Sequence, residues 1–303
     1  MKKIIIICGP TGVGKTSFAI RLAQQFQGEI VGADSMQIYR HMNIGTAKPD
    51  PEETNLIRHH LIDIVDPGEE FDAGRYVKLA DEAVEDILSR GKIPIIAGGT
   101  GLYIKALLDG LFRSEPVCTQ TLSRLTKEFE EKGAHALHEK LAECDPAAAD
   151  KIHPHDSFRV IRALEVFQTT GKRISDHQGR HGFSGRRYEG LKIGLYMDRE
   201  KLYGRINQRV DAMLDKGLLN EVASLVERGY SLDLKSMQSI GYKHMAMLIR
   251  NEVDPAEAVR LLKRDTRRYA KRQLTWFRKD KDIIWLTPSE IEASKKLIKE
   301  FLT

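Results

Sequence analysis

Eight consecutive residues near the amino terminus have the types and spacing of a phosphate-binding loop. They fit the pattern GxxxxGK[ST] and are, in order, Gly9, Pro10, Thr11, Gly12, Val13, Gly14, Lys15 and Thr16. Glycines let the backbone turn its N–H groups towards a polyphosphate, Lys15 supplies a positive charge, and the Thr16 hydroxyl can bind Mg²⁺. An apolar run precedes the loop and an amphipathic segment follows it, which is the context that this pattern requires. Because it recognises phosphate groups, the loop does not distinguish a nucleoside triphosphate from another diphosphate ester.

A carboxylate follows the second apolar run of the chain. Asp34, in the sequence Ala-Asp-Ser-Met-Gln, falls at the carboxyl end of an expected strand, where ligand sites of open α/β sheets lie. Beside a phosphate loop it can position Mg²⁺ through water or accept a proton from a nucleophile. The alternative is an aspartate that only caps a turn. Gly98, Gly99 and Thr100 end another apolar run and direct N–H groups and a hydroxyl to the same edge.

Positive charge is concentrated in one C-terminal segment, although the net charge of the whole chain is only +5. Between residues 259 and 281 there are ten basic and two acidic residues, a local field that nucleic-acid phosphates would feel. On a helix, arginines spaced four residues apart form one stripe. Those arginines are Arg260, Arg264, Arg268 and Arg272. The alternative is a solvated charged face without a partner.

The elements that position these residues have the rhythm of βαβ units in a parallel sheet. Strands are expected at 4–8, 28–33, 93–97, 191–197 and 283–286. Helices are expected at 17–26, 76–89, 199–228, 236–250 and 255–279, with a last helix after Pro288. The fold class is therefore α/β, a parallel sheet flanked by helices.

The segment 113–187 differs from the rest of the chain. It contains helical stretches broken by glycine and proline, which indicates a helical insertion between two core segments, 1–112 and 188–303. The longest apolar run is far shorter than the ~20 residues of a membrane-spanning helix, so we expect a cytoplasmic protein with no membrane partner. Three scattered cysteines suggest neither disulfides nor a zinc site. A monomer is expected, and no motif specifies the oligomeric state.

Six segments together resemble bacterial tRNA dimethylallyltransferases over nearly the whole chain. They are GPTGVGKT at 9–16, ADSMQIYRHMNIGTAKP at 33–49, AGGTGLYIKALLDG at 97–110, RVIRALEVF at 159–167, SIGYK at 239–243 and AKRQLTWFR at 270–278. The first is shared with many enzymes, whereas DSMQ with IGTAKP and AKRQ with TWFR are far more specific. The resemblance implies a fold like that of P-loop NTPases.

The resemblance also implies a reaction. An enzyme of this family transfers the dimethylallyl group of dimethylallyl diphosphate to N6 of adenosine 37 in tRNA and releases diphosphate. Residues 11–16 would hold that diphosphate with Mg²⁺ on Thr16, and Asp34 would be the general base. Arg205 would contact the diphosphate, although Arg209 lies one helical turn away and could replace it.

The partners implied are dimethylallyl diphosphate and the anticodon stem-loop of tRNA. The helical insertion and the basic helix would hold the stem. The residues expected at tRNA are Asp34, Ser35, Met36, Gln37, Thr100, Phe158, Arg159, Val160, Ile161, Arg162, Gln238, Ser239, Ile240, Gly241, Tyr242 and Lys243. Phe158 stands where some relatives carry a polar residue, which puts a specific base contact there in question.

The residues by themselves leave other functions open. A small-molecule kinase would use the phosphate loop equally well and would leave the arginine stripe unexplained. A nucleotide-switched RNA-binding protein is disfavoured because the guanine-reading NKxD motif and an apolar run ending in Asp-Glu are absent. A prenyltransferase acting on free adenine nucleotides would not need the helical insertion.

Overall fold

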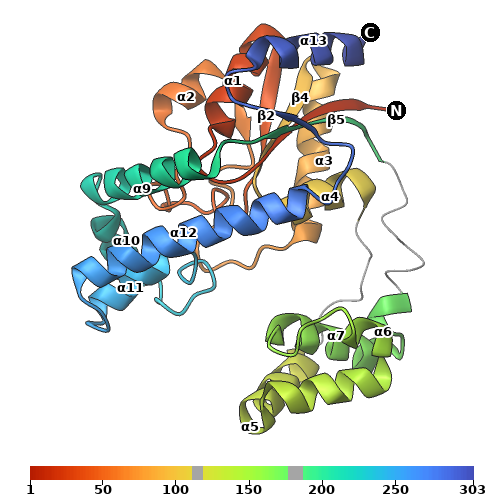
Figure 1. Ribbon diagram of the computed structural model, residues 1–303, viewed down its shortest axis with the longest axis vertical. Coiled ribbons are helices and arrows are strands. Elements are labelled where there is room, and N and C mark those ends of the chain that lie inside the picture. The colour runs from red at the N-terminus through yellow and green to blue at the C-terminus, as the bar shows by residue number, and fades with distance from the viewer. Residues whose placement is uncertain (111–118, 177–186) are drawn as a thin grey trace. The chain divides into compact units, whose positions relative to one another are not determined.

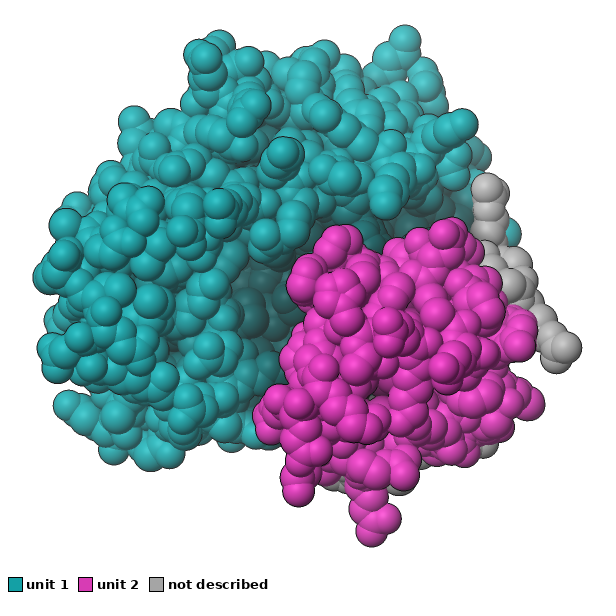
Figure 2. Space-filling view, turned by 60° about the horizontal axis from the view of Figure 1, so that its bottom comes forward, with its two compact units in different colours: residues 1–108, 187–303 teal, residues 109–186 magenta. Residues whose placement is uncertain are grey.

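The computed structural model describes residues 1–110, 119–176 and 187–303 (Figure 1). These residues form two compact units, coloured separately in Figure 2. The first unit comprises residues 1–108 and 187–303, and the second comprises residues 109–186. The described part of the second unit is helical, and the expected insertion at 113–187 stays a prediction.

The first unit is built on a six-stranded sheet in which every described pairing is parallel. Its strands are β1 (Lys3–Cys8), β2 (Gly28–Ala33), β3 (His59–His60), β4 (Ile93–Gly98), β5 (Glu189–Leu195) and β6 (Ile284–Leu286). Their order across the sheet is β3-β2-β4-β1-β5-β6. The predicted parallel sheet is confirmed. The short edge strand β3 was not predicted, because two histidines carry no strand signal of their own.

Helices cover both faces of this sheet (Figure 1). The helices of the first unit are α1 (Lys15–Gln25), α2 (Pro51–Leu56), α3 (Ala73–Ser89), α4 (Gly101–Asp109), α9 (Arg199–Asp215), α10 (Leu218–Glu227), α11 (Tyr242–Ile249), α12 (Pro255–Phe277) and α13 (Ile291–Leu302). Side chains alternate between the faces of a strand, so Ile4 and Ile6 pack with α3 and α4. Ile5 and Ile7 pack on the opposite face with α1, α9 and α13. Such a sheet, buried on both sides, explains the unbroken apolar run of β1.

Helices α9 to α12 form a further packed layer with the loop that follows β2. The helix predicted at 199–228 was wrong as a single element. It divides into α9 and α10 at Gly217, whose φ of 91° is left-handed and does not continue a helix. The helix predicted at 236–250 begins only at Tyr242, after a turn-rich segment.

The second unit has its own core. Its described helices include α5 (Thr119–Cys144), which is kinked at Gly133, α6 (Pro146–Ala149) and α7 (Ser157–Thr170). Leu125, Leu137, Leu141 and Leu164 are buried between these helices. Over the described parts of the chain, no helix combines the length and the apolar character needed to cross a bilayer.

Candidate active site

Three neighbouring strands deliver the predicted site to one edge of the sheet. Strand β4 lies between β1 and β2, and its last residue, Gly98, is in register with both Cys8 of β1 and Ala33 of β2. The phosphate loop, the Gly99-Thr100 turn and Asp34 therefore leave the sheet at the same level. The sequence predicted all three segments at this edge, because each of them directly follows an apolar run.

The phosphate loop has the backbone that its glycines predict. Gly9, Gly12 and Gly14 have φ values of 144°, 82° and 102°, a region that side chains rarely adopt. Helix α1 begins at Lys15, so its first N–H groups and its positive dipole end point out of the loop. The Lys15 ammonium donates to the Pro10 carbonyl at 2.8 Å. Burial lowers the pKa of Lys15 to about 8, with Arg209 acting in the same direction and Asp34 opposing it.

Two arginines of α9 lie against this loop. The Arg205 guanidinium is 3.5 Å from the Val13 carbonyl, and Arg209 is 3.5 Å from the Thr11 hydroxyl. Burial lowers the pKa of Arg209, Asp34 raises it, and Arg205 lowers it again. The structure therefore brings both arginines to the phosphate loop, with Arg209 on the Asp34 side and Arg205 beside Gly14.

Asp34 caps a turn and remains available for chemistry. Its Oδ1 atom accepts the N–H groups of Met36 at 2.9 Å and Gln37 at 3.3 Å, whereas Oδ2 takes part in neither bond. The N–H of Ser35 donates to the Thr100 hydroxyl at 3.0 Å. Oδ1 thus caps the turn, as the alternative interpretation proposed. Its two hydrogen bonds also fix the direction in which Oδ2 points.

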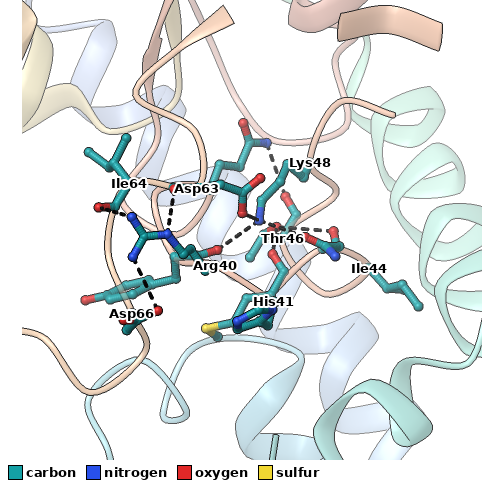
Figure 3. Close-up of polar contacts among 12 residues, drawn as sticks. Arg40, His41, Ile44, Thr46, Lys48, Asp63, Ile64 and Asp66 are labelled. Carbon is teal, nitrogen blue, oxygen red and sulfur yellow. Dashed lines mark hydrogen bonds and ion pairs between the residues drawn. The ribbon is translucent and has the colours of Figure 1, made fainter. Parts of the chain in front are cut away.

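The loop that follows Asp34 is held by its own side chains. Gln37 donates from its amide to the carbonyls of Thr46 at 3.3 Å and Ala47 at 3.1 Å. The ammonium of Lys48 donates to the Tyr39 carbonyl and to Asp63, at 2.8 and 2.6 Å (Figure 3). The Gln37 amide therefore supports the loop, and a base contact would have to use its remaining oxygen.

A glutamate that sequence reasoning missed anchors the same loop from α10. The Glu221 carboxylate accepts the N–H groups of Asn43, Ile44 and Gly45 at 2.9, 2.8 and 3.1 Å. The Tyr242 hydroxyl donates to it at 2.6 Å. A single acidic residue on a charged helix gave no sequence signal for this role.

Helix α12 contributes a second group of missed residues. A Cβ atom on Gly99 would collide with the Gln273 amide, and one on Gly101 would collide with the Trp276 indole. These glycines are therefore needed for close packing of α12 against the strand end. Trp276 is 40% exposed and Phe277 is buried, so only Phe277 of this pair is a core aromatic.

The residues expected at tRNA divide by exposure. In the second unit, Phe158 is 73% exposed and Arg159 is exposed, whereas Val160 and Ile161 belong to that unit's core. Arg162 is half-buried and pairs with Glu165. Side-chain contact with RNA from this segment would thus involve its first two residues.

The segment 238–243 divides in the same way. Gln238 is exposed, and Ser239 and Ile240 are half-buried, whereas Gly241 and Tyr242 are buried. Lys243 is 3.3 Å from Asp265. Tyr242 therefore supports Glu221 and is not exposed to RNA. The positive charge of Lys243 is partly neutralised by Asp265, so Lys243 would attract RNA phosphates less strongly.

The basic stripe of α12 is partly neutralised. Arg260 is paired with Glu257, and Arg264 with Asp265. Arg268 is highly exposed, and its guanidinium lies 3.9 Å from the Asp265 carboxylate. Arg272 is also exposed and lies over the Tyr269 ring. The C-terminal half of the stripe, Arg268 and Arg272, is therefore more available to phosphates than the N-terminal half.

Two groups of side chains offer ligand atoms to a divalent cation. Glu29, His60 and Asp86 come close enough to share an ion, but Glu29 already binds Arg90 and Lys92. That cluster lies near the amino end of β2, away from the phosphate loop, and it is an ion-pair network. The Thr16 hydroxyl and the Asp34 carboxylate supply the oxygen donors that Mg²⁺ prefers, so these residues fit the ion.

Comparisons with known proteins agree with this site. The family model described as IPP transferase matches residues 37–280. The tRNA dimethylallyltransferase of Desulfosudis oleivorans is 52% identical over 99% of this chain and 96% of its own, and that of Acetivibrio thermocellus is 51% identical with the same coverage.

Solved structures give the same result. The tRNA isopentenylpyrophosphate transferase of Bacillus halodurans has a TM-score of 0.75 at 40% identity, covering 100% of this chain and 97% of its own. A eukaryotic dimethylallyltransferase solved acting on tRNA has a TM-score of 0.82 at 34% identity, covering 98% and 78%. The resemblance seen in the sequence is confirmed, and the chain belongs to the IPP transferase family of tRNA dimethylallyltransferases.

Proposed function

We propose that this chain transfers the dimethylallyl group from dimethylallyl diphosphate to N6 of adenosine 37 in tRNA and releases diphosphate. The observation that carries the proposal is the shared edge at which the phosphate loop, Thr100 and Asp34 meet. It supports the proposal because a diphosphate held in that loop would lie beside a carboxylate whose direction is fixed. A kinase would require the same loop, but α12 with its exposed arginines would have no part in it.

The chemistry follows from the groups at this edge. The exocyclic amine of adenine is a poor nucleophile because its lone pair is delocalised, so proton removal by Asp34 assists bond formation. Negative charge develops on the departing diphosphate. Lys15, Arg205, Arg209 and the N–H groups at the start of α1 stabilise that charge electrostatically.

Mg²⁺, bound by the Thr16 hydroxyl and near Asp34, would supply further positive charge at the diphosphate. Water must be excluded from the site, because it would convert the allylic donor to an alcohol. A tRNA loop lying over the site would exclude it. Since the acceptor is tRNA, we place the reaction in the cytoplasm.

RNA binding is assigned to exposed residues. Phe158 and Arg159 on the second unit, and Arg268 and Arg272 on α12, present an aromatic ring and three charges to solvent. Single-stranded RNA loops are recognised by stacking and by phosphate contacts. A target base in such a loop must be turned out to reach the half-buried Asp34 carboxylate.

The first experiment supplies the protein with Mg²⁺, labelled dimethylallyl diphosphate and an unmodified anticodon stem-loop. A matched stem-loop has guanosine in place of adenosine 37. Label should enter only the adenosine RNA. Failure of transfer, together with ATP consumption in the presence of hydroxylated metabolites, would instead assign the loop to a kinase.

The role of Asp34 is tested by Asp34→Asn. Asparagine keeps an oxygen that can accept from Met36 and Gln37, so the turn is retained while the base is lost. We expect the turnover rate to fall roughly 10²- to 10⁴-fold with RNA affinity unchanged. An unaltered rate would assign Asp34 to the turn alone.

A further inference from the structure

We propose that Gln273 is a positioning residue that holds the phosphate loop and the Asp34 turn at a fixed separation. Its side chain closes a series of hydrogen bonds that crosses the ends of β1, β4 and β2. The inference rests on the proposed function, because it takes the phosphate loop as the diphosphate site. It adds a residue that contacts neither substrate and acts through the two segments that do.

Both ends of the Gln273 amide are used. The N–H of Thr11 donates to its Oε1 at 2.8 Å, and its Nε2 donates to the Gly99 carbonyl at 2.9 Å. Gln273 is 6% exposed. A buried amide bonded at both ends has one orientation, since rotating it by half a turn would set donor against donor and acceptor against acceptor.

The bonds continue from Gly99 to Asp34. The N–H of Thr100 donates to the Ala33 carbonyl at 3.0 Å, and the Thr100 hydroxyl accepts from Ser35 at 3.0 Å. Gln273 therefore joins the loop after β1 to the turn after β4, and Thr100 joins that turn to the residues on either side of Asp34. These links determine the distance from the leaving diphosphate to the base.

The fit around Gln273 is close and leaves little room for movement. A Cβ atom at Gly99 would overlap the amide nitrogen. One turn earlier on α12, burial raises the pKa of the Tyr269 hydroxyl, and the charge of the Asp34 carboxylate raises it further. The inner face of α12 is thus part of the wall of the site.

The bond from Thr11 has a consequence for phosphate binding. With its N–H donated to Gln273, Thr11 is not a phosphate donor through its backbone. The N–H of Val13 donates to the Pro10 carbonyl at 3.4 Å, so the N–H groups that remain to line the site belong to Gly12, Gly14, Lys15 and Thr16. Loss of the Gln273 bond would free Thr11 and let the first half of the loop move, which weakens the preorganised charge around the diphosphate.

The experiment compares Gln273→Met, which keeps the length of the side chain and removes both bonds, with Gln24→Met on the exposed face of α1. Binding of inorganic pyrophosphate with Mg²⁺ is measured by calorimetry, and kcat and donor KM are measured with the stem-loop. We expect the pyrophosphate Kd and the donor KM of Gln273→Met to rise about tenfold, with RNA affinity and the values for Gln24→Met unchanged.

Gln273→Glu distinguishes a positioning role from a purely structural role, because only the positioning role makes the pyrophosphate affinity of this variant depend on pH. Protonated glutamate has the acceptor and the donor of glutamine, whereas the carboxylate lacks the donor and repels the Gly99 carbonyl. Its pyrophosphate affinity relative to that of the wild type should therefore recover as the pH falls from 8 to 6. This variant also serves if Gln273→Met does not fold.

The outcomes separate the two proposals. Wild-type protein that fails to bind pyrophosphate would overturn the proposed function. Wild-type binding with equal affinity in Gln273→Met, or a ratio for Gln273→Glu that does not change with pH, would overturn the role of Gln273. A lower melting temperature with unchanged Kd would assign Gln273 to stability alone.

Discussion

The ammonium of Lys15 should take up a proton when the diphosphate binds. Burial lowers its pKa to about 8 in the free protein, although Asp34 opposes this shift. A bound diphosphate supplies negative charge and returns that pKa towards its ordinary value of 10.5. At pH 8 about half of the free protein lacks this proton, so binding should consume roughly 0.5 proton per site.

The affinity should follow the same titration. Lys15 is about nine-tenths protonated at pH 7 and about one-tenth protonated at pH 9, which predicts a roughly tenfold loss of diphosphate affinity, or about 1.4 kcal/mol. If deprotonation of the diphosphate controlled binding, the affinity would instead rise between pH 7 and pH 9. Calorimetry in two buffers of different ionisation enthalpy measures both the affinity and the protons exchanged.

Lys15→Arg is the matched control. A guanidinium remains charged throughout this pH range, and protons exchanged by pyrophosphate itself contribute equally to both proteins. The difference between them therefore isolates Lys15. Equal proton uptake by the two proteins, or a wild-type affinity that does not change between pH 7 and 9, would refute this account of the loop.

Three other predictions concern RNA binding, acid stability and packing. Arg268→Ala with Arg272→Ala should weaken stem-loop binding and flatten its salt dependence by about two charges, which filter binding at several salt concentrations measures. Glu29→Gln should cost about 1–3 kcal/mol at pH 7. The bonds from Arg90, and then those from Lys92 and His60, hold the pKa of Glu29 well below its usual value despite burial, so in urea titrations this stabilisation should decline progressively as the pH falls below 4.5. Gly101→Ala should displace Trp276, and its tryptophan fluorescence should shift; unchanged emission would contradict the packing.

Local patterns predicted those parts of the fold whose causes are local. Strand β2 was predicted with its observed bounds, because Gly28 to Ala33 is an apolar run between turn residues. The phosphate loop was predicted because its glycines are required by its own backbone. Strand β3 depends instead on pairing with β2, so its two histidines gave no signal.

The supporting residues of the site could not be predicted for a related reason. Gln273 is separated from Thr11 by 262 positions, and Glu221 from Asn43 by 178. Glutamine and glutamate are common on charged helices, and a single sequence contains nothing that links them to a distant loop. The AKRQ segment contributed to the family resemblance, but no role was assigned to Gln273 within it.

Helix α12 joins these observations into one argument about the site. Its inner face carries Ala270, Gln273 and Phe277, which are buried, and its outer face carries the exposed Arg268 and Arg272. The same helix thus holds the strand ends together and presents charge to RNA. Substitutions on the inner face should alter donor binding at constant RNA affinity, and those on the outer face should do the reverse. A variant on either face that changed both affinities equally would mean that RNA binding moves α12 itself.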